Sequence, residues 1–310
     1  MLRSKLPHLT QAQAPLTREV TVVNEWGEAV TSTIPCERAL TVYVDKRELV
    51  TLMTLGGHPE LLVLGYLRNQ RLVQSVHDIE SITVDWDVGA AAVKTRNGIE
   101  HIEERTAKRV VTTGCGQGSV FGGIMDDLDL IHLAPATLLQ EQLYGIVNAI
   151  RLQESIYKAA GSVHGCALFQ GDTMLVFIED VGRHNAIDTI AGWMWMGGQA
   201  PTLATACAAL PPEGAQFALG RPGGEPTEGA DKVLYTTGRL TSEMVIKSAQ
   251  MGIPIAVSRS GITEMGLEVA QRVGLCAIGR ATHKRFLCYS AFERLELQPE
   301  LAGARLRAVA

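Results

Sequence analysis

The sequence lacks three features that would each indicate a particular class of protein: a long apolar run, closely spaced cysteines and an excess of positive charge. No apolar run reaches the roughly 20 residues that a membrane-spanning helix needs, so we expect no membrane partner. The 310 residues carry a net charge of −5, which argues against bulk electrostatic binding of nucleic acid. With 46% hydrophobic and 20% charged residues, the composition is that of an ordinary globular protein.

The cysteines are scattered, and no two of them have the Cys-x-x-Cys spacing. The six are Cys36, Cys115, Cys166, Cys207, Cys276 and Cys288. This pattern is unlike a disulfide framework or a zinc site and favours reduced thiols in a cytoplasmic protein. Cys207, Cys276 and Cys288 stand in apolar stretches, so we expect them to be small core residues.

The first part of the chain, residues 19–135, reads as a β-rich α+β portion that follows a flexible lead-in over residues 1–18. A helix is expected to begin at His58-Pro59, because proline is tolerated in a first turn. The expected strands are two hairpins at 19–35 and 39–54, and further strands at 81–85, 91–95 and 99–103.

The second part, residues 136–310, reads as an α/β domain. Alternating strand and helix patterns between residues 232 and 279 predict a β-α-β-α-β unit with a parallel sheet covered by helices. Before this unit we expect the elements that follow: a long helix at 136–158, a hairpin at 163–178, a helix at 185–196 and a Pro/Gly-rich loop at 209–230.

Cys115 is the first candidate for chemistry. Gly114, Gly116 and Gly118 surround it directly after an apolar, β-branched run. Glycines leave a backbone open, so the sulfur can be approached and N–H groups can converge on it, which favours a reactive thiolate. The simpler alternative is a strand that ends in a Gly-rich turn with an incidental small residue. The segment alone does not decide between the two.

A second candidate is the polar string Glu-Asp-Val-Gly-Arg-His at 179–184, at an expected junction of strand and helix. An acid, an arginine and a histidine together favour a functional site, with Asp180, Arg183 and His184 as possible supporting residues. A structural explanation competes, since Asp180 can cap the helix and Arg183 can pair with a nearby acid. His164 begins the preceding strand and has the same two explanations.

Taken in order, these strings resemble the FdhD family, the sulfur carriers that formate dehydrogenases need for activity. The resemblance covers roughly residues 35 to 290. Its motifs are Thr-Gly-Cys-Gly at 113–116, the histidine strand at 161–167, Glu-Asp-Val-Gly-Arg-His at 179–184, and the stretches at 237–249, 253–258 and 278–289.

The resemblance implies a function and a fold. Family members accept persulfide sulfur from a cysteine desulfurase and deliver it to the molybdenum cofactor, bis-molybdopterin guanine dinucleotide, before it enters apo-formate dehydrogenase. Cys115 would be the catalytic sulfur carrier, and a homodimer is expected. The implied fold is a cytidine deaminase-like mixed sheet flanked by helices. The zinc motifs of deaminases do not occur here, so we expect no metal.

The resemblance also places the cofactor-binding stretch at Arg280, Ala281, Thr282, His283, Lys284 and Arg285. Such a basic run suits phosphates, although alone it would equally be a solvated turn. Arg239, Ser258 and Arg259 are further candidates because they follow strands of a parallel sheet.

Gly118 replaces the second cysteine that many family members have, so how a lone Cys115 releases sulfur is open. A cofactor-binding chaperone that transfers no sulfur is therefore the alternative function. A cysteine hydrolase that uses Cys115 with His164 or His184 is a third.

Overall fold

The computed structural model describes residues 6–99, 110–111, 118–119, 128–197 and 229–302. The chain forms two compact units. Unit 1 comprises Met1–Asp127, Glu154–Cys166 and Val176–Thr227, and unit 2 comprises Leu128–Gln153, Ala167–Leu175 and Glu228–Ala310. Both units take residues from either side of residue 136, so they alternate along the chain. The expected division into domains at residue 136 stays a prediction.

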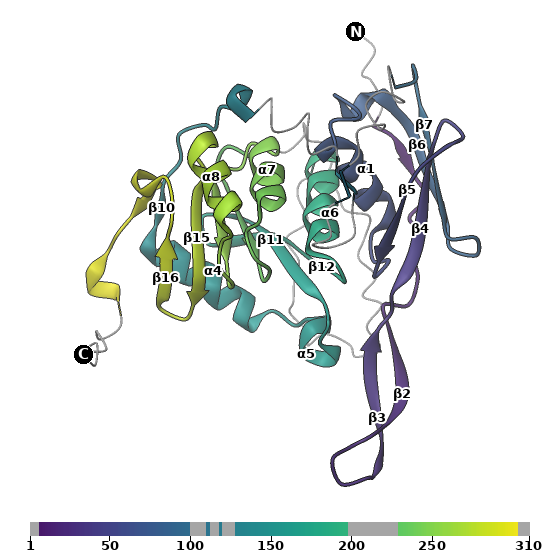
Figure 1. Cartoon of the computed structure of the whole chain (residues 1–310), viewed down its shortest axis with the longest axis horizontal. Helices are drawn as coiled ribbons and strands as arrows, with labels where there is room; N and C mark the ends of the chain where they lie inside the picture. The colour runs from purple at the N-terminus through teal and green to yellow at the C-terminus, as the bar shows by residue number, and fades with distance from the viewer. Residues whose placement is uncertain (1–5, 100–109, 112–117, 120–127, 198–228, 303–310) are drawn as a thin grey trace. The chain divides into compact units, whose positions relative to one another are not determined.

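Unit 1 contains a five-stranded sheet with the order β1-β6-β7-β4-β5. Figure 1 labels four of these strands, β4 to β7. Its strands are β1 (His8–Leu9), β4 (Arg38–Val44), β5 (Arg47–Thr54), β6 (Ile79–Asp85) and β7 (Ala90–Thr95). Apolar residues alternate along β4, so Leu40, Val42 and Val44 are buried on one face of the sheet. The strand expected at 99–103 lies outside the described residues, apart from Ile99.

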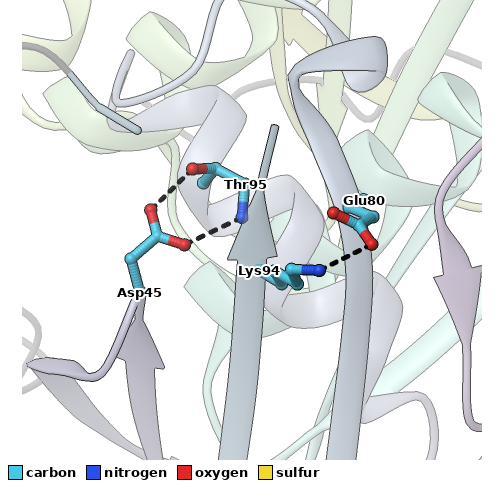
Figure 2. A network of polar contacts seen from close by, with 4 residues as sticks. All are labelled: Asp45, Glu80, Lys94 and Thr95. Carbon is cyan, nitrogen blue, oxygen red and sulfur yellow. Dashed lines mark hydrogen bonds and ion pairs between the residues drawn. The ribbon is translucent and has the colours of Figure 1, made fainter. Parts of the chain in front are cut away.

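The second predicted hairpin is formed by β4 and β5, and only Asp45 and Lys46 lie between these strands. Asp45 and Lys46 have φ values of 47° and 74°, as in a two-residue hairpin turn. Figure 2 shows that the Asp45 carboxylate accepts hydrogen bonds from the Thr95 N–H at 3.0 Å and the Thr95 hydroxyl at 2.6 Å. On the same sheet Lys94 pairs with Glu80 at 2.8 Å. The two hydrogen bonds between Asp45 and Thr95 hold the turn against the end of β7.

The N-terminal residues differ from the expected flexible lead-in. His8 and Leu9 pair in parallel with Ser81 and Ile82 of β6. The buried carboxylate of Glu60 then accepts hydrogen bonds from the Thr10 hydroxyl and the Ala12 N–H, at 2.8 and 2.7 Å. Composition alone does not indicate this, because the strand partners and Glu60 all lie about 50 residues or more further along the chain.

Two buried helices, α1 (Pro59–Asn69) and α6 (Arg183–Trp195), pack closely against each other in unit 1. Glycines at the crossing allow their backbones to touch. A Cβ on Gly65 would lie 1.7 Å from the Asp188 carbonyl oxygen, and one on Gly192 would lie 2.0 Å from the Leu61 oxygen. The start of α1 at Pro59 and its buried leucines follow the sequence-based expectation.

A long two-stranded ribbon completes this part of unit 1, formed by β2 (Thr17–Val23) and β3 (Ala29–Pro35). It is the predicted first hairpin. Asn24 closes its turn by accepting hydrogen bonds from the N–H groups of Trp26 and Glu28.

Unit 2 contains a six-stranded sheet with the order β12-β11-β13-β14-β15-β16. Its strands are β11 (His164–Gln170), β12 (Thr173–Asp180), β13 (Lys232–Thr236), β14 (Ile255–Ser258), β15 (Cys276–Thr282) and β16 (Arg285–Cys288). The first two of these also run into unit 1. As predicted, β13, β14 and β15 are parallel and connected by α7 (Ser242–Gln250) and α8 (Glu264–Val273), which lie side by side (Figure 1).

The single long helix predicted over 136–158 is wrong. A short strand, β10 (Leu138–Leu139), pairs with β17 (Leu295–Glu296), and two helices follow, α4 (Gln140–Leu152) and α5 (Ile156–Ala160). Ser155 begins the second helix by accepting a hydrogen bond from the Lys158 N–H. The helical pattern of apolar residues continues across Ser155, so this pattern alone does not show that one helix ends and another begins there.

Short 3₁₀ helices complete the described elements. They are Val76–Asp78, Leu128–Leu130, Phe292–Arg294 and Pro299–Leu301. The whole is a mixed α/β fold, as expected, while its likeness to cytidine deaminases stays a prediction.

Candidate functional site

Cys115 lies outside the described residues. The structure does describe the two short strands on either side of it, β8 (Val110–Val111) and β9 (Gly118–Ser119). They pair in antiparallel fashion, Val110 with Ser119 and Val111 with Gly118. The segment that carries Cys115 therefore connects two paired strands, and the role of the thiol stays a prediction.

Asp180 ends β12 and is buried in unit 1, where four donors surround its carboxylate. One oxygen accepts the Thr54 hydroxyl at 2.5 Å and the Leu55 N–H at 3.1 Å. The other accepts the Gly182 N–H at 3.1 Å and the Asn185 amide at 2.7 Å. Burial raises the pKa of Asp180, and these hydrogen bonds oppose that shift. The arrangement connects the end of β5 to the start of α6.

Glu179, the first residue of the same motif, serves a different element. Its carboxylate accepts hydrogen bonds from the Ile156 N–H at 2.6 Å and the Tyr157 N–H at 3.1 Å, the first amides of α5. Burial raises the pKa of Glu179, against the effect of these two bonds. The two acids of the motif thus bind backbone groups of separate elements.

The other predicted supporting residues lie at the same junction. Arg183 and His184 begin α6 and are buried, and His164, the first residue of β11, is half-buried. The thiol of Cys166 donates a long hydrogen bond to the Arg183 carbonyl, at 3.8 Å. Strand and helix are joined here inside unit 1, which is compatible with a supporting role for the motif.

An open groove of about 690 Å³ lies in unit 2, and it brings together four of the six residues of the predicted cofactor-binding stretch. Arg280, Thr282, Lys284 and Arg285 line it. The remaining lining residues are Gln140, Tyr144, Phe286, Leu287, Leu297, Pro299 and Ala302. Three of the lining residues are cationic and none of them is acidic, so the lining suits an anionic ligand.

The backbone of Arg280 is fixed in an unusual conformation. The register of β15 against β16 shifts between Gly279 and Thr282, and Arg280 within this bulge has a φ of 51°. Its N–H donates to the Ser260 carbonyl at 2.5 Å. Bulges of this kind redirect a side chain out of the regular alternation, and Arg280 is exposed and lines the groove.

Two aromatic rings that sequence reasoning missed also line the groove. Tyr144 of α4 and Phe286 of β16 have ring centroids 6.3 Å apart and are tilted by 60°. The Tyr144 hydroxyl donates to the Lys284 carbonyl at 3.2 Å and accepts from the Gln140 amide at 2.8 Å. Phe286 directly follows the basic run and could have been noticed, whereas Tyr144 is 140 residues away from Lys284 in sequence.

The other predicted cofactor-binding residues are not among the lining residues of the groove. Ala281 is buried, and His283 is exposed at the turn before β16 with a φ of 51°. Ser258 is fully buried and its hydroxyl donates to the Gly238 carbonyl at 2.7 Å, so it joins two neighbouring loops. Arg239 and Arg259 are exposed in those loops. Whether any of them contacts a ligand stays a prediction.

The described residues hold no group of three or more His, Cys, Asp or Glu side chains placed to bind a metal ion. Within the same residues, none of the helices combines the length and the apolar character needed to span a membrane.

Fold and groove together define a mixed α/β protein with a cationic groove lined in part by aromatic rings. The sequence model of the FdhD/NarQ family matches residues 35–210 and 217–296, so the chain belongs to the FdhD/NarQ family.

Curated relatives are similar over nearly their whole length. The sulfur carrier protein FdhD of Listeria innocua is 26% identical over 271 residues, which cover 86% of this chain and 93% of the relative. That of Bacillus pumilus is 25% identical over 291 residues, 91% of this chain and 98% of the relative.

A solved structure has the same fold. The crystal structure of a proposed formate dehydrogenase accessory protein from Desulfotalea psychrophila superposes with a TM-score of 0.69 and 23% identity. The match covers 91% of this chain and 100% of that one.

Proposed function

We propose that this protein is a sulfur carrier that activates a formate dehydrogenase. Cys115 accepts the outer sulfur of a cysteine desulfurase persulfide and passes it to bis-molybdopterin guanine dinucleotide, which is the bound substrate. The family match over most of the chain carries this proposal, and Cys115 stands in the Thr-Gly-Cys-Gly string of the resemblance.

The groove of unit 2 supports the part of the proposal that concerns the substrate. Each guanine nucleotide presents a diphosphate and a flat base. Arg280, Lys284 and Arg285 can balance the phosphate charge through charge-assisted hydrogen bonds. Tyr144 and Phe286 offer ring faces on which a purine can stack. The groove therefore has the two kinds of group that such a nucleotide needs.

The chemistry at Cys115 is a transfer of sulfane sulfur. The Cys115 thiolate attacks the outer sulfur of the donor persulfide, a new S–S bond forms on Cys115, and the donor cysteine leaves as a thiolate. The same proposal includes apo-formate dehydrogenase as the receiving partner, a homodimer, a cytoplasmic location and a cytidine deaminase-like fold.

Intact-mass measurement after incubation with a desulfurase and cysteine tests the proposal. A gain of one sulfur atom is expected on the wild type and on Cys36→Ala, and none on Cys115→Ala. No gain on any of the three proteins would support the alternative function, a cofactor-binding chaperone that transfers no sulfur. Peptide mapping of the loaded wild type then identifies the cysteine that carries the added sulfur.

A further inference from the structure

Cys276 and Cys288 lie next to each other in unit 2, although twelve residues separate them in sequence. Their Sγ atoms are 3.7 Å apart, close to van der Waals contact. Strand pairing produces this proximity. Cys288 of β16 is paired with Ile278 of β15. Cys276 lies two residues before Ile278 on β15, so its side chain is on the same face of the hairpin as that of Cys288.

The two thiols differ in their surroundings. Cys276 is fully buried, whereas Cys288 is half-buried on the last strand in the order of the sheet. The hydrogen bond between them lowers the pKa of Cys288, while the same contact and burial raise the pKa of Cys276. The more exposed sulfur is therefore the one that ionises first, and the thiolate is the form that reacts with oxidants.

We propose that Cys276 and Cys288 form a reversible disulfide, a modification site whose oxidant is hydrogen peroxide. The Cys288 thiolate attacks one peroxide oxygen, which breaks the O–O bond and gives a sulfenic acid, with the second oxygen released as water after protonation. Cys276 then attacks the Cys288 sulfur and displaces the sulfenic oxygen as a second water. Two thiols and one peroxide thus yield one disulfide and two waters, a two-electron oxidation. An external dithiol reverses the bond by thiol exchange.

The geometry allows the bond to close. A disulfide needs an S–S distance of about 2.05 Å. The two Sγ atoms are 3.7 Å apart, so they must move closer to each other before the bond can form. Strand β16 ends the sheet order, so its only strand neighbour among the described residues is β15, the strand that carries Cys276. The same hairpin carries Arg280, Lys284 and Arg285 of the groove, so the bond would connect the two strands that border it.

Peptide mapping of the full-length protein tests the site without relying on a variant. After treatment with hydrogen peroxide and blocking of remaining thiols, trypsin separates Cys276 in peptide 273–280 from Cys288 in peptide 286–294. The expected product is these two peptides joined, two hydrogens lighter than their sum, and split again by dithiothreitol. Peptides that stay unlinked while Cys288 carries a sulfinic or sulfonic acid would overturn the proposal.

Four variants sharpen the result. Cys276→Ser and Cys288→Ser should each lose the linked peptide. Cys36→Ser is the matched control, since Cys36 is also half-buried but lies in unit 1, and it should retain the link. The link should also form in Cys115→Ser, because this site does not depend on the proposed sulfur transfer. Loss of the link in Cys115→Ser would show instead that the pair is oxidised through Cys115.

Discussion

The hydroxyl of Thr54 donates a hydrogen bond to the buried carboxylate of Asp180 at 2.5 Å, across 126 residues of sequence. The same hydroxyl accepts the Gly56 N–H at 3.1 Å. Asp180 belongs to the 179–184 motif of the resemblance, yet three of the four partners described for its carboxylate, Thr54, Leu55 and Asn185, lie outside that motif. The motif therefore has a structural task in unit 1, whatever further role its arginine and histidine have.

We expect Thr54→Val to lower the free energy of unfolding by about 1–3 kcal/mol, because it leaves a buried carboxylate and a buried N–H each short of one partner. Thr51→Val on the same strand is the control. Its hydroxyl makes an exposed hydrogen bond to Thr41, and the change should stay within about 0.5 kcal/mol. Chemical denaturation compares the two, and equal effects would show that the Asp180 contact contributes nothing.

The stability that Glu179 confers should depend on pH. Folding raises its pKa, so between the ordinary glutamate pKa of about 4.3 and the raised value the folded state binds more protons than the unfolded state. The free energy of unfolding therefore decreases as pH rises through this window. The Glu179→Gln variant does not titrate at this position. The free energy of unfolding of the wild type, compared with that of this variant, should therefore be highest below pH of about 4 and should decrease as the pH rises above it. Unfolding curves of both proteins at a series of pH values test this, and a constant difference would contradict it.

The crossing of α1 and α6 should not accept side chains at its glycines. Gly65→Ala and Gly192→Ala each place a Cβ within about 2 Å of a backbone oxygen of the other helix, as measured above. We expect either change to reduce the free energy of unfolding by about 3 kcal/mol or more, well beyond the roughly 1 kcal/mol that alanine gains in a helix. Gly57→Ala is the control, because its Cβ would make only ordinary contact with Leu16. Thermal melts that show Gly65→Ala as stable as Gly57→Ala would contradict the observed crossing.

Local patterns predicted much of this fold. Alternating and helical periodicities gave the hairpins, α1, α6 and the β-α-β-α-β unit, because each signal lies within one short stretch. The break between α4 and α5 was missed because Glu179 supplies part of the α5 cap from a distant strand. The cations of the groove belong to one run that the sequence shows, whereas Tyr144 reaches the groove only through the tertiary fold. That this run binds a cofactor stays a prediction. Cys276 and Cys288 were each expected to be small core residues. Cys276 is buried, but Cys288 is only half-buried, and their proximity could not be predicted because it depends on the register of two strands.

Binding of a guanine nucleotide should depend on the cations of the groove. We expect Lys284→Ala with Arg285→Ala to weaken binding of GDP, with each lost charge-assisted contact costing about 1.5–3 kcal/mol, or roughly 10- to 150-fold. The difference from wild type should shrink as salt screens the charges. Lys94→Ala removes a cation from unit 1 and should leave affinity unchanged. Calorimetric titration measures all three proteins, and an unchanged affinity in the double variant would place the nucleotide elsewhere.

Cys115→Ser should abolish activation of formate dehydrogenase and leave the protein folded. Serine is nearly the same size but cannot form a persulfide, and a thiol among three glycines should contribute little packing energy. Activity of a formate dehydrogenase produced together with each variant measures the first effect, and thermal melts measure the second. Cys36→Ser is the control and should retain full activation. If Cys115→Ser instead melts at a markedly lower temperature, Cys115 is a core residue and its loss of activity is no sign of sulfur transfer.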